Sequence, residues 1–130
     1  MSQSYKPAGH NSVSPYLIVK DASRTIQFLK QAFGAEELMR LTDDDDDGGI
    51  LHAEVRIDDS VVMLADSDPT HPVQTVHVHV YVPDVDATYR RALEAGATSV
   101  QAPLQKQDPD KRGGVREPGG TTWWIGTRIG

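Results

Sequence analysis

Apolar and polar residues alternate along two stretches of the chain in the manner of β-strands. Residues 13–19 are rich in β-branched and aromatic side chains, and residues 75–82 carry valine at alternate positions. Such patterns predict strands that bury one face. Each stretch is followed by a helical pattern, with apolar residues on one face between Asp21 and Gly34 and again between Asp84 and Gly96. Each half of the chain is therefore predicted to open with a strand and a helix.

Capping residues mark both ends of each predicted helix. Asp21 and Asp84 can accept hydrogen bonds from the free N–H groups of a first helical turn. Gly34 and Gly96 can adopt the left-handed conformation that closes a helix. Three more strands are then predicted in each half. They cover residues 36–41, a strand opened by 48–50, and 60–65 in the first half, and residues 98–101, a strand opened by 113–115, and 121–129 in the second.

The two halves match each other at an offset of about 60 residues, which indicates an internal repeat. Each half is a βαβββ unit, so the predicted fold class is α+β with two such modules. We expect one domain over residues 1–130, with module one at 12–67 and module two at 74–129. Long loops at 43–47 and 103–112 precede the third strand of each unit, and such loops often edge a binding site.

Composition narrows the function classes. A chain of 130 residues suits one domain, and it contains no apolar run of the roughly 20 residues that span a bilayer. The absence of cysteine excludes disulfides and thiolate chemistry, and residues 1–10 do not resemble a signal peptide, so a cytoplasmic location is expected. A net charge of −6 without basic clusters disfavours nucleic acid as a partner. A small-molecule ligand is the remaining expectation.

Five segments resemble the vicinal oxygen chelate superfamily, the group of glyoxalases, bleomycin-resistance proteins and extradiol dioxygenases. They are VKDAS (19–23), FLKQAFGA (28–35), LHAEVRIDDSVVMLAD (51–66), VPDVD (82–86) and GVREPGGTTWWI (114–125). Within that group the chain is most similar to the PhnB-like branch. The resemblance implies that the sheets of the two modules together form a cleft, commonly completed by a second copy of the chain. We therefore expect a homodimer.

The resemblance also implies where a divalent metal would bind. Metal-dependent members carry a histidine on the first strand of each module and a glutamate on each closing strand. This chain has His77 at one of those positions, but Ser14, Met63 and Trp124 at the other three. Hydroxyl, thioether and indole groups are poor ligands for Mg²⁺, Mn²⁺ or Zn²⁺. No metal or other cofactor is therefore expected in the usual family manner, although a rearranged site built from His77, His52 and Glu54 remains an alternative.

Strand parity assigns the polar residues of several strands to one face. If the valine faces pack against the helices, the opposite faces line the cleft, where Trp124 can stack on a ligand. The alternative is that these side chains are merely polar groups on a half-solvated sheet, or a dimer contact. The candidate ligand-binding residues are Tyr16, His52, Glu54, His77, His79, Arg112 and Trp124.

Three functional hypotheses follow. The first is a protein of the bleomycin-resistance kind that binds an amphipathic, cationic or aromatic small molecule, such as an antibiotic, without a metal. The second is a glyoxalase-like isomerase or lyase with a rearranged histidine-based metal site. The third is a structural or regulatory protein with a vestigial cleft. The acidic run at 43–47 lacks the ligand spacing of a calcium loop and is interpreted as a solvated loop.

Overall fold

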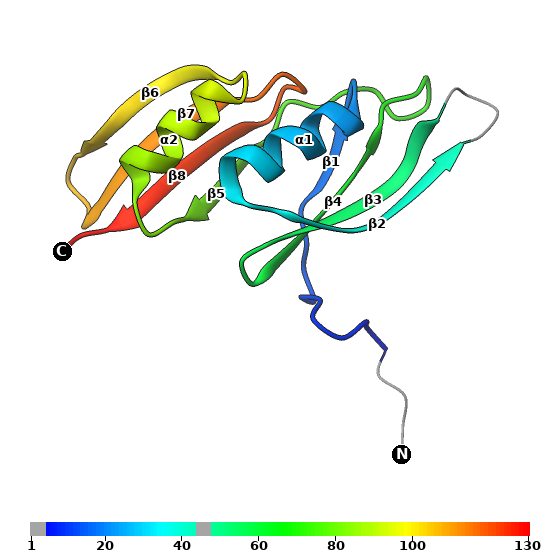
Figure 1. Cartoon of the computed structure of the whole chain (residues 1–130), viewed down its shortest axis with the longest axis horizontal. Coiled ribbons are helices and arrows are strands. Elements are labelled where there is room, and N and C mark those ends of the chain that lie inside the picture. The colour runs from blue at the N-terminus through cyan, green and yellow to red at the C-terminus, as the bar shows by residue number, and fades with distance from the viewer. Residues whose placement is uncertain (1–4, 44–47) are drawn as a thin grey trace.

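Two four-stranded sheets, each with one helix, make up the chain in a computed structural model that describes residues 5–43 and 48–130 (Figure 1). The elements are β1 (Tyr16–Val19), α1 (Ala22–Phe33), β2 (Glu36–Asp43), β3 (Gly49–Ile57), β4 (Ser60–Asp66), β5 (His77–Tyr81), α2 (Val85–Glu94), β6 (Thr98–Gln105), β7 (Asp110–Arg116) and β8 (Thr122–Arg128). The predicted α+β class and the βαβββ repeat are confirmed.

The strand orders of the two sheets are equivalent, β1-β4-β3-β2 and β5-β8-β7-β6. In each sheet the first strand pairs in parallel with the closing strand, and the other pairings are antiparallel. A parallel pair needs a crossover connection, which in each module passes through the helix. Each module thus forms its whole sheet from its own residues.

The helices form where capping and apolar periodicity predicted them. The Asp21 side chain accepts a hydrogen bond from the backbone N–H of Arg24, and the Asp84 side chain accepts one from Ala87. Gly34 ends α1 with φ 68°, a left-handed conformation that costs glycine little because it has no Cβ. In the described part of the chain, neither helix is long and apolar enough to cross a membrane.

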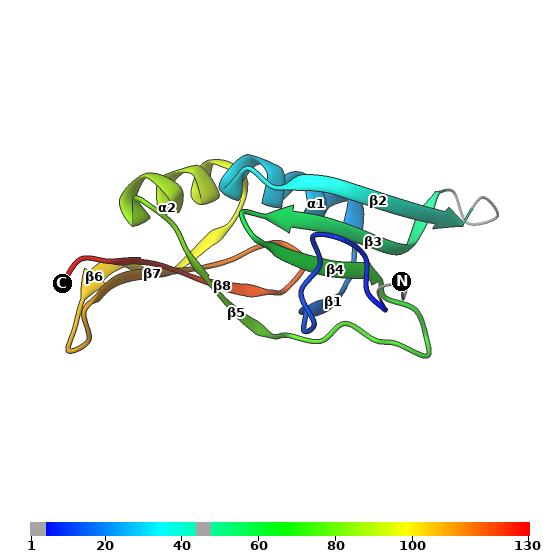
Figure 2. The same cartoon turned by 90° about the horizontal axis from the view of Figure 1, so that it is seen from below.

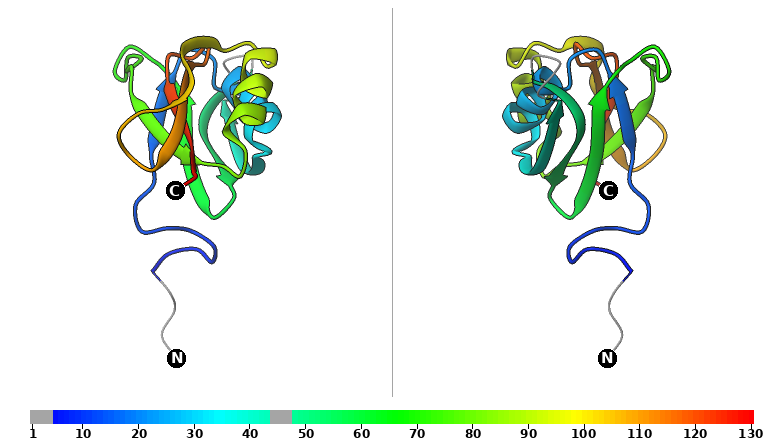
Figure 3. Two further views of the ribbon diagram at one scale, coloured as in Figure 1. Left: turned by 90° about the vertical axis from the view of Figure 1, so that its left-hand side faces the viewer. Right: turned by 90° about the vertical axis from the view of Figure 1, so that its right-hand side faces the viewer.

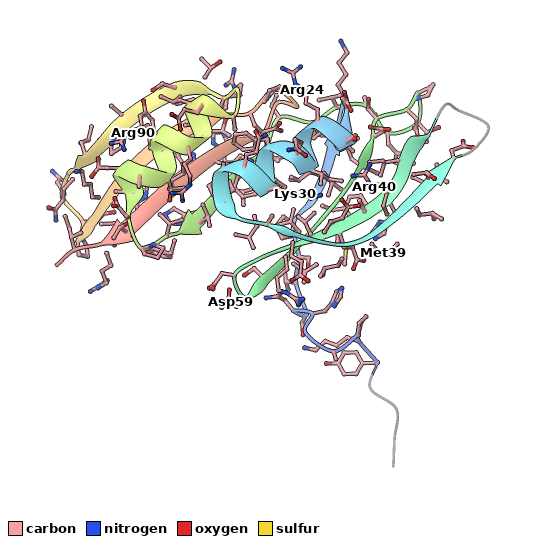
Figure 4. All side chains as sticks on the ribbon, viewed as in Figure 1. Arg24, Lys30, Met39, Arg40, Asp59 and Arg90 are labelled. Atoms are coloured by element: carbon pink, nitrogen blue, oxygen red, sulfur yellow. The ribbon has the colours of Figure 1, made fainter. Side chains whose placement is uncertain are left out.

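Both helices lie on the same side of the two sheets and contact each other (Figures 2 and 3). The buried core is continuous across the modules, because the ring of Phe33 on α1 lies 5.1 Å from that of Trp123 on β8. Figure 4 shows Arg24 and Lys30 on α1 and Arg90 on α2, all of them exposed. Within residues 5–43 and 48–130, no helix lies on the opposite face of either sheet.

Several predicted boundaries were wrong. The third strand of module two begins at Asp110 rather than at Gly113, so the predicted loop at 103–112 is reduced to the connection between Gln105 and Asp110. Leu51 is exposed, although strict alternation along β3 would place it on the side of the buried Ala53 and Val55, because the pairing of β2 with β3 shifts register there. Of the acidic run, Asp43 ends β2, while residues 44–47 lie outside the described residues.

Candidate ligand-binding site

Burial confirms which sheet faces are free. In β3, Ala53 and Val55 are fully buried under the helices, while His52 and Glu54 lie on the opposite face. In β5, the valines pack against the core while His77 and its alternate neighbours are exposed. The candidate residues therefore lie on the two helix-free faces, as strand parity predicted.

On the second sheet, Trp124 and His77 form one flat surface. The indole Nε1–H donates a hydrogen bond of 2.9 Å to Nδ1 of His77, and the two ring planes differ by only 8°. An indole N–H and an imidazole lone pair both lie in their ring planes, so this bond between parallel rings places them edge to edge. The result is a platform two rings wide, which we call the Trp124–His77 platform.

Two glycines let aromatic side chains lie close against this sheet. A Cβ on Gly114 would come within 2.5 Å of Trp124 Cζ3, and a Cβ on Gly126 would come within 3.0 Å of His79 Nε2. Strand register places Gly114 directly beside Trp124, on the neighbouring strand. Any larger residue would lift these rings from the backbone. The flatness of this face therefore depends on glycine.

A charged network borders the platform. Arg112 donates through Nε to His79 Nε2 (3.1 Å) and through its two Nη atoms to Asp108 (3.0 Å) and Asp110 (2.9 Å). Burial of the imidazole and the adjacent Arg112 charge lower the pKa of His79. Tyr81 donates to Asp110 (2.7 Å), and this bond raises the pKa of Tyr81. Because Arg112 is held by two carboxylates, it is fixed in orientation.

A groove of about 410 Å³ opens between the platform and this network. One wall is the Trp124 indole, and the rest combines charged, amide and apolar side chains. Its lining residues are Gln101, Leu104, Lys106, Gln107, Asp108, Asp110, Arg112 and Trp124. The Oδ1 atom of Asp110 is buried and has no hydrogen-bond donor in the described chain.

On the first sheet, three candidate residues lie in a hydrogen-bonded row. Tyr16 Oη lies 2.9 Å from His52 Nδ1, and His52 Nε2 lies 2.9 Å from Glu54 Oε2. His10, from the segment before β1, places Nε2 2.6 Å from Glu54 Oε1. The hydrogen bonds from His10 and His52 lower the pKa of Glu54. This row belongs to a different sheet from His77 and Trp124.

Comparison with known proteins identifies the family. The model of the Glyoxalase/Bleomycin resistance protein/Dioxygenase superfamily matches residues 10–125. The chain belongs to this superfamily. An uncharacterized Mycobacterium tuberculosis protein, Rv0887c, is 40% identical over 91% of this chain and 75% of its own length.

Solved structures share the fold. TioX from Micromonospora sp. ML1 matches with a TM-score of 0.75 and 26% identity, over 92% of this chain and 99% of TioX. TnmS3, an antibiotic binding protein from Streptomyces sp. CB03234, matches with a TM-score of 0.69 and 20% identity, over 92% of this chain and 99% of TnmS3. At 20% identity, the second likeness concerns the fold alone.

The superfamily's metal chemistry can be tested against the residues present. At the positions of the usual ligands, the Ser14 hydroxyl is buried without a hydrogen-bond partner, and Trp124 presents a ring that donates rather than coordinates. His77 uses Nδ1 to accept from that ring. In the parts of the chain that the structure describes, no group of three His, Asp or Glu side chains could hold a metal ion, and the set His77, His52 and Glu54 is divided between the two sheets. The donor set does not fit a metal held in the usual family manner.

Some site residues escaped the sequence analysis. His10 precedes the predicted module and belongs to no periodic pattern, so no signal pointed to it. Asp110 was assigned to a loop because the glycine pair after it was taken as the start of the strand. Gly114 offered a usable signal, since pairing the third and closing strands places it beside Trp124.

Proposed function

We propose that this protein binds a small molecule with a planar aromatic part, in a cleft that needs no metal, in the manner of the bleomycin-resistance members of its superfamily. The observation that carries the proposal is the Trp124–His77 platform, which lies flat beside an open groove. Stacking on a tryptophan contributes about 0.5–1.5 kcal/mol beyond the area that it buries. A platform of two coplanar rings favours a fused or linked aromatic ligand.

The charges around the groove favour an amphipathic ligand. Lys106 and Arg112 balance Asp108 and Asp110, so the groove has no large net charge. The carboxylate of Asp108 is exposed at the groove and can accept a further hydrogen bond. A ligand with an N–H group, charged or neutral, next to its aromatic part would supply the donor. An antibiotic of this shape is our preferred ligand class.

The helix-free faces also support a homodimer, because each is open in the single chain. Tyr16 is 48% exposed and Tyr81 61% exposed, and both lie on these faces. A second copy that set its first sheet against the second sheet of this chain would enclose the platform and complete the cleft. Placement in the PhnB-like branch and a cytoplasmic location also belong to this proposal.

Fluorescence titration tests the proposal directly. A planar aromatic cation such as proflavine is expected to quench the emission of Trp124 at saturation. The variant Trp124→Leu should abolish the specific quenching, while Tyr5→Leu, which removes an exposed ring outside the sheets, should leave it unchanged. Quenching that survives in Trp124→Leu would place binding elsewhere and refute the platform. Calorimetric titration with Mn²⁺, Ni²⁺ and Zn²⁺ completes the test, since one ion per cleft, lost in His77→Ala, would overturn the metal-free model.

A further inference from the structure

In the row of hydrogen bonds on the first sheet, the donor and the acceptor of each bond can be assigned. Glu54 has a lowered pKa and is ionised at neutral pH, so both of its oxygens can only accept. The nitrogen of each imidazole that faces Glu54 must therefore carry hydrogen, at Nε2 of His52 and at Nε2 of His10. In a neutral His52 ring, Nδ1 is then the lone pair, and it faces the hydroxyl of Tyr16 at 2.9 Å.

This arrangement matches that of a catalytic triad, in which a nucleophile, a histidine and an orienting carboxylate are linked by hydrogen bonds. The carboxylate fixes the tautomer and orientation of the histidine and stabilises the imidazolium that forms when the histidine takes a proton. Here Glu54 is the carboxylate, His52 is the base and the phenol of Tyr16 is the hydroxyl. His10 holds the second oxygen of Glu54, and its own Nδ1 is buried without a partner.

We propose that Tyr16 is an activated nucleophile that reacts with acyl donors. Its oxygen forms a bond to the carbonyl carbon, the bond from that carbon to the leaving group breaks, and the phenol proton passes to Nδ1 of His52. The leaving group departs with the electron pair and then takes up a proton. Tyr16 has room to react, because it lines a pocket of about 500 Å³ whose other walls include Ile18, Leu51 and Ala65.

Two other tyrosines serve as controls within the same chain. Tyr5 is 90% exposed, Tyr81 61% and Tyr16 48%. Exposure alone therefore predicts the order of reactivity Tyr5, Tyr81, Tyr16. The hydrogen bonds predict a different order, because Tyr81 donates to the carboxylate of Asp110, which raises its pKa, whereas Tyr16 donates to a base. The two explanations differ in which tyrosine reacts first.

Acetylation by N-acetylimidazole, followed by peptide mass spectrometry of the unmodified chain at pH 7.5, separates them. We expect Tyr16 to be acetylated at least about tenfold faster than Tyr5, since general base assistance by a positioned histidine accelerates reactions by roughly 10²–10⁴. Tyr81 should be slowest. An order that follows exposure would overturn the proposal without any variant.

Two substitutions then assign the cause. His52→Gln should bring the rate of Tyr16 down to that of Tyr5 or below, with folding checked by circular dichroism. Asp86→Asn is the control, because Asp86 lies on α2 in the other module, where it faces Lys111, and its loss should leave the rate of Tyr16 unchanged. A folded His52→Gln protein whose Tyr16 reacts at the original rate would refute the relay. Ligand binding at the Trp124–His77 platform has no part in these measurements, so failure of either proposal leaves the other standing.

Discussion

Replacing Gly114 by alanine tests whether the platform depends on bare backbone. The new Cβ would lie 2.5 Å from Cζ3 and 2.7 Å from Cε3 of Trp124, whereas carbon atoms in contact keep about 3.5–4.0 Å. The ring must move by about 1 Å. Because Trp124 is only partly buried, it can lift from the sheet, which places the overpacking cost near the low end of about 1–3 kcal/mol.

Two further effects contribute to the net change in unfolding free energy. Lifting the indole weakens its hydrogen bond to His77, a loss of about 1 kcal/mol. Alanine in place of glycine in a strand is favourable by roughly 0.5–1 kcal/mol. We therefore expect Gly114→Ala to lower the unfolding free energy by about 1 kcal/mol, which corresponds to a melting temperature lower by about 3–5 °C in a chain of this length.

A double-mutant cycle in urea isolates the clash. In a Trp124→Ala background the ring is gone, so Gly114→Ala should stabilise the protein by roughly 0.5 kcal/mol, a change of sign. The same destabilisation in both backgrounds would refute the reasoning. It would show that the backbone at position 114, and not the ring above it, requires glycine.

Three polar residues give further predictions. Asp66→Ala removes the acceptor of two backbone N–H groups at 2.7 Å each and should lower the unfolding free energy in urea by about 2–3 kcal/mol, while Asp59→Ala, on an exposed turn, should have little effect. Glu117→Gln places a side-chain NH₂ group against a backbone N–H and should lower the unfolding free energy in urea by about 1–2 kcal/mol. Thr25→Val, which removes only one hydrogen bond to Glu117, should lower it by about 1 kcal/mol. Because the pKa of Glu54 is lowered, its ionised form stabilises the fold fully above the usual glutamate pKa of about 4.3, and this stabilisation is lost as pH falls through the lowered value. The stability difference between wild type and Glu54→Gln should thus shrink during acid titration; a constant difference would count against this linkage.

Sequence patterns were sufficient to predict the fold because the interactions behind them act between residues close in the chain. An aspartate that caps a helix and a glycine that ends it act within one turn, as Asp21 and Gly34 do. Strand parity likewise separates Trp123, 1% exposed, from Trp124 on the free face. The strand that begins at Asp110 was missed because glycine pairs usually signal a turn, whereas here both glycines lie inside the sheet and the second, Gly114, lies beneath the Trp124 ring.

The site itself was predictable only as a set of residues on a face. Parity placed Tyr16, His52 and Glu54 on one side of the first sheet, but it carries no information on rotamers or hydrogen bonds. The contact between His10 and Glu54 joins residues 44 positions apart, from a segment without periodicity. Leu51 shows the limit of parity, since a single register shift moved it to the exposed side.

The hydrogen bond from Thr25 to the buried Glu117 joins the helix of one module to a turn of the other, 92 residues away in the chain. Together with the shared core, it means that neither half can satisfy its polar groups or cover its apolar surface alone. A chain divided within the exposed connection at 68–75 would therefore give two fragments that are unstable separately and assemble when mixed. The repeat thus makes this protein a candidate for fragment complementation, in which recovery of the folded state indicates that the two fragments have associated.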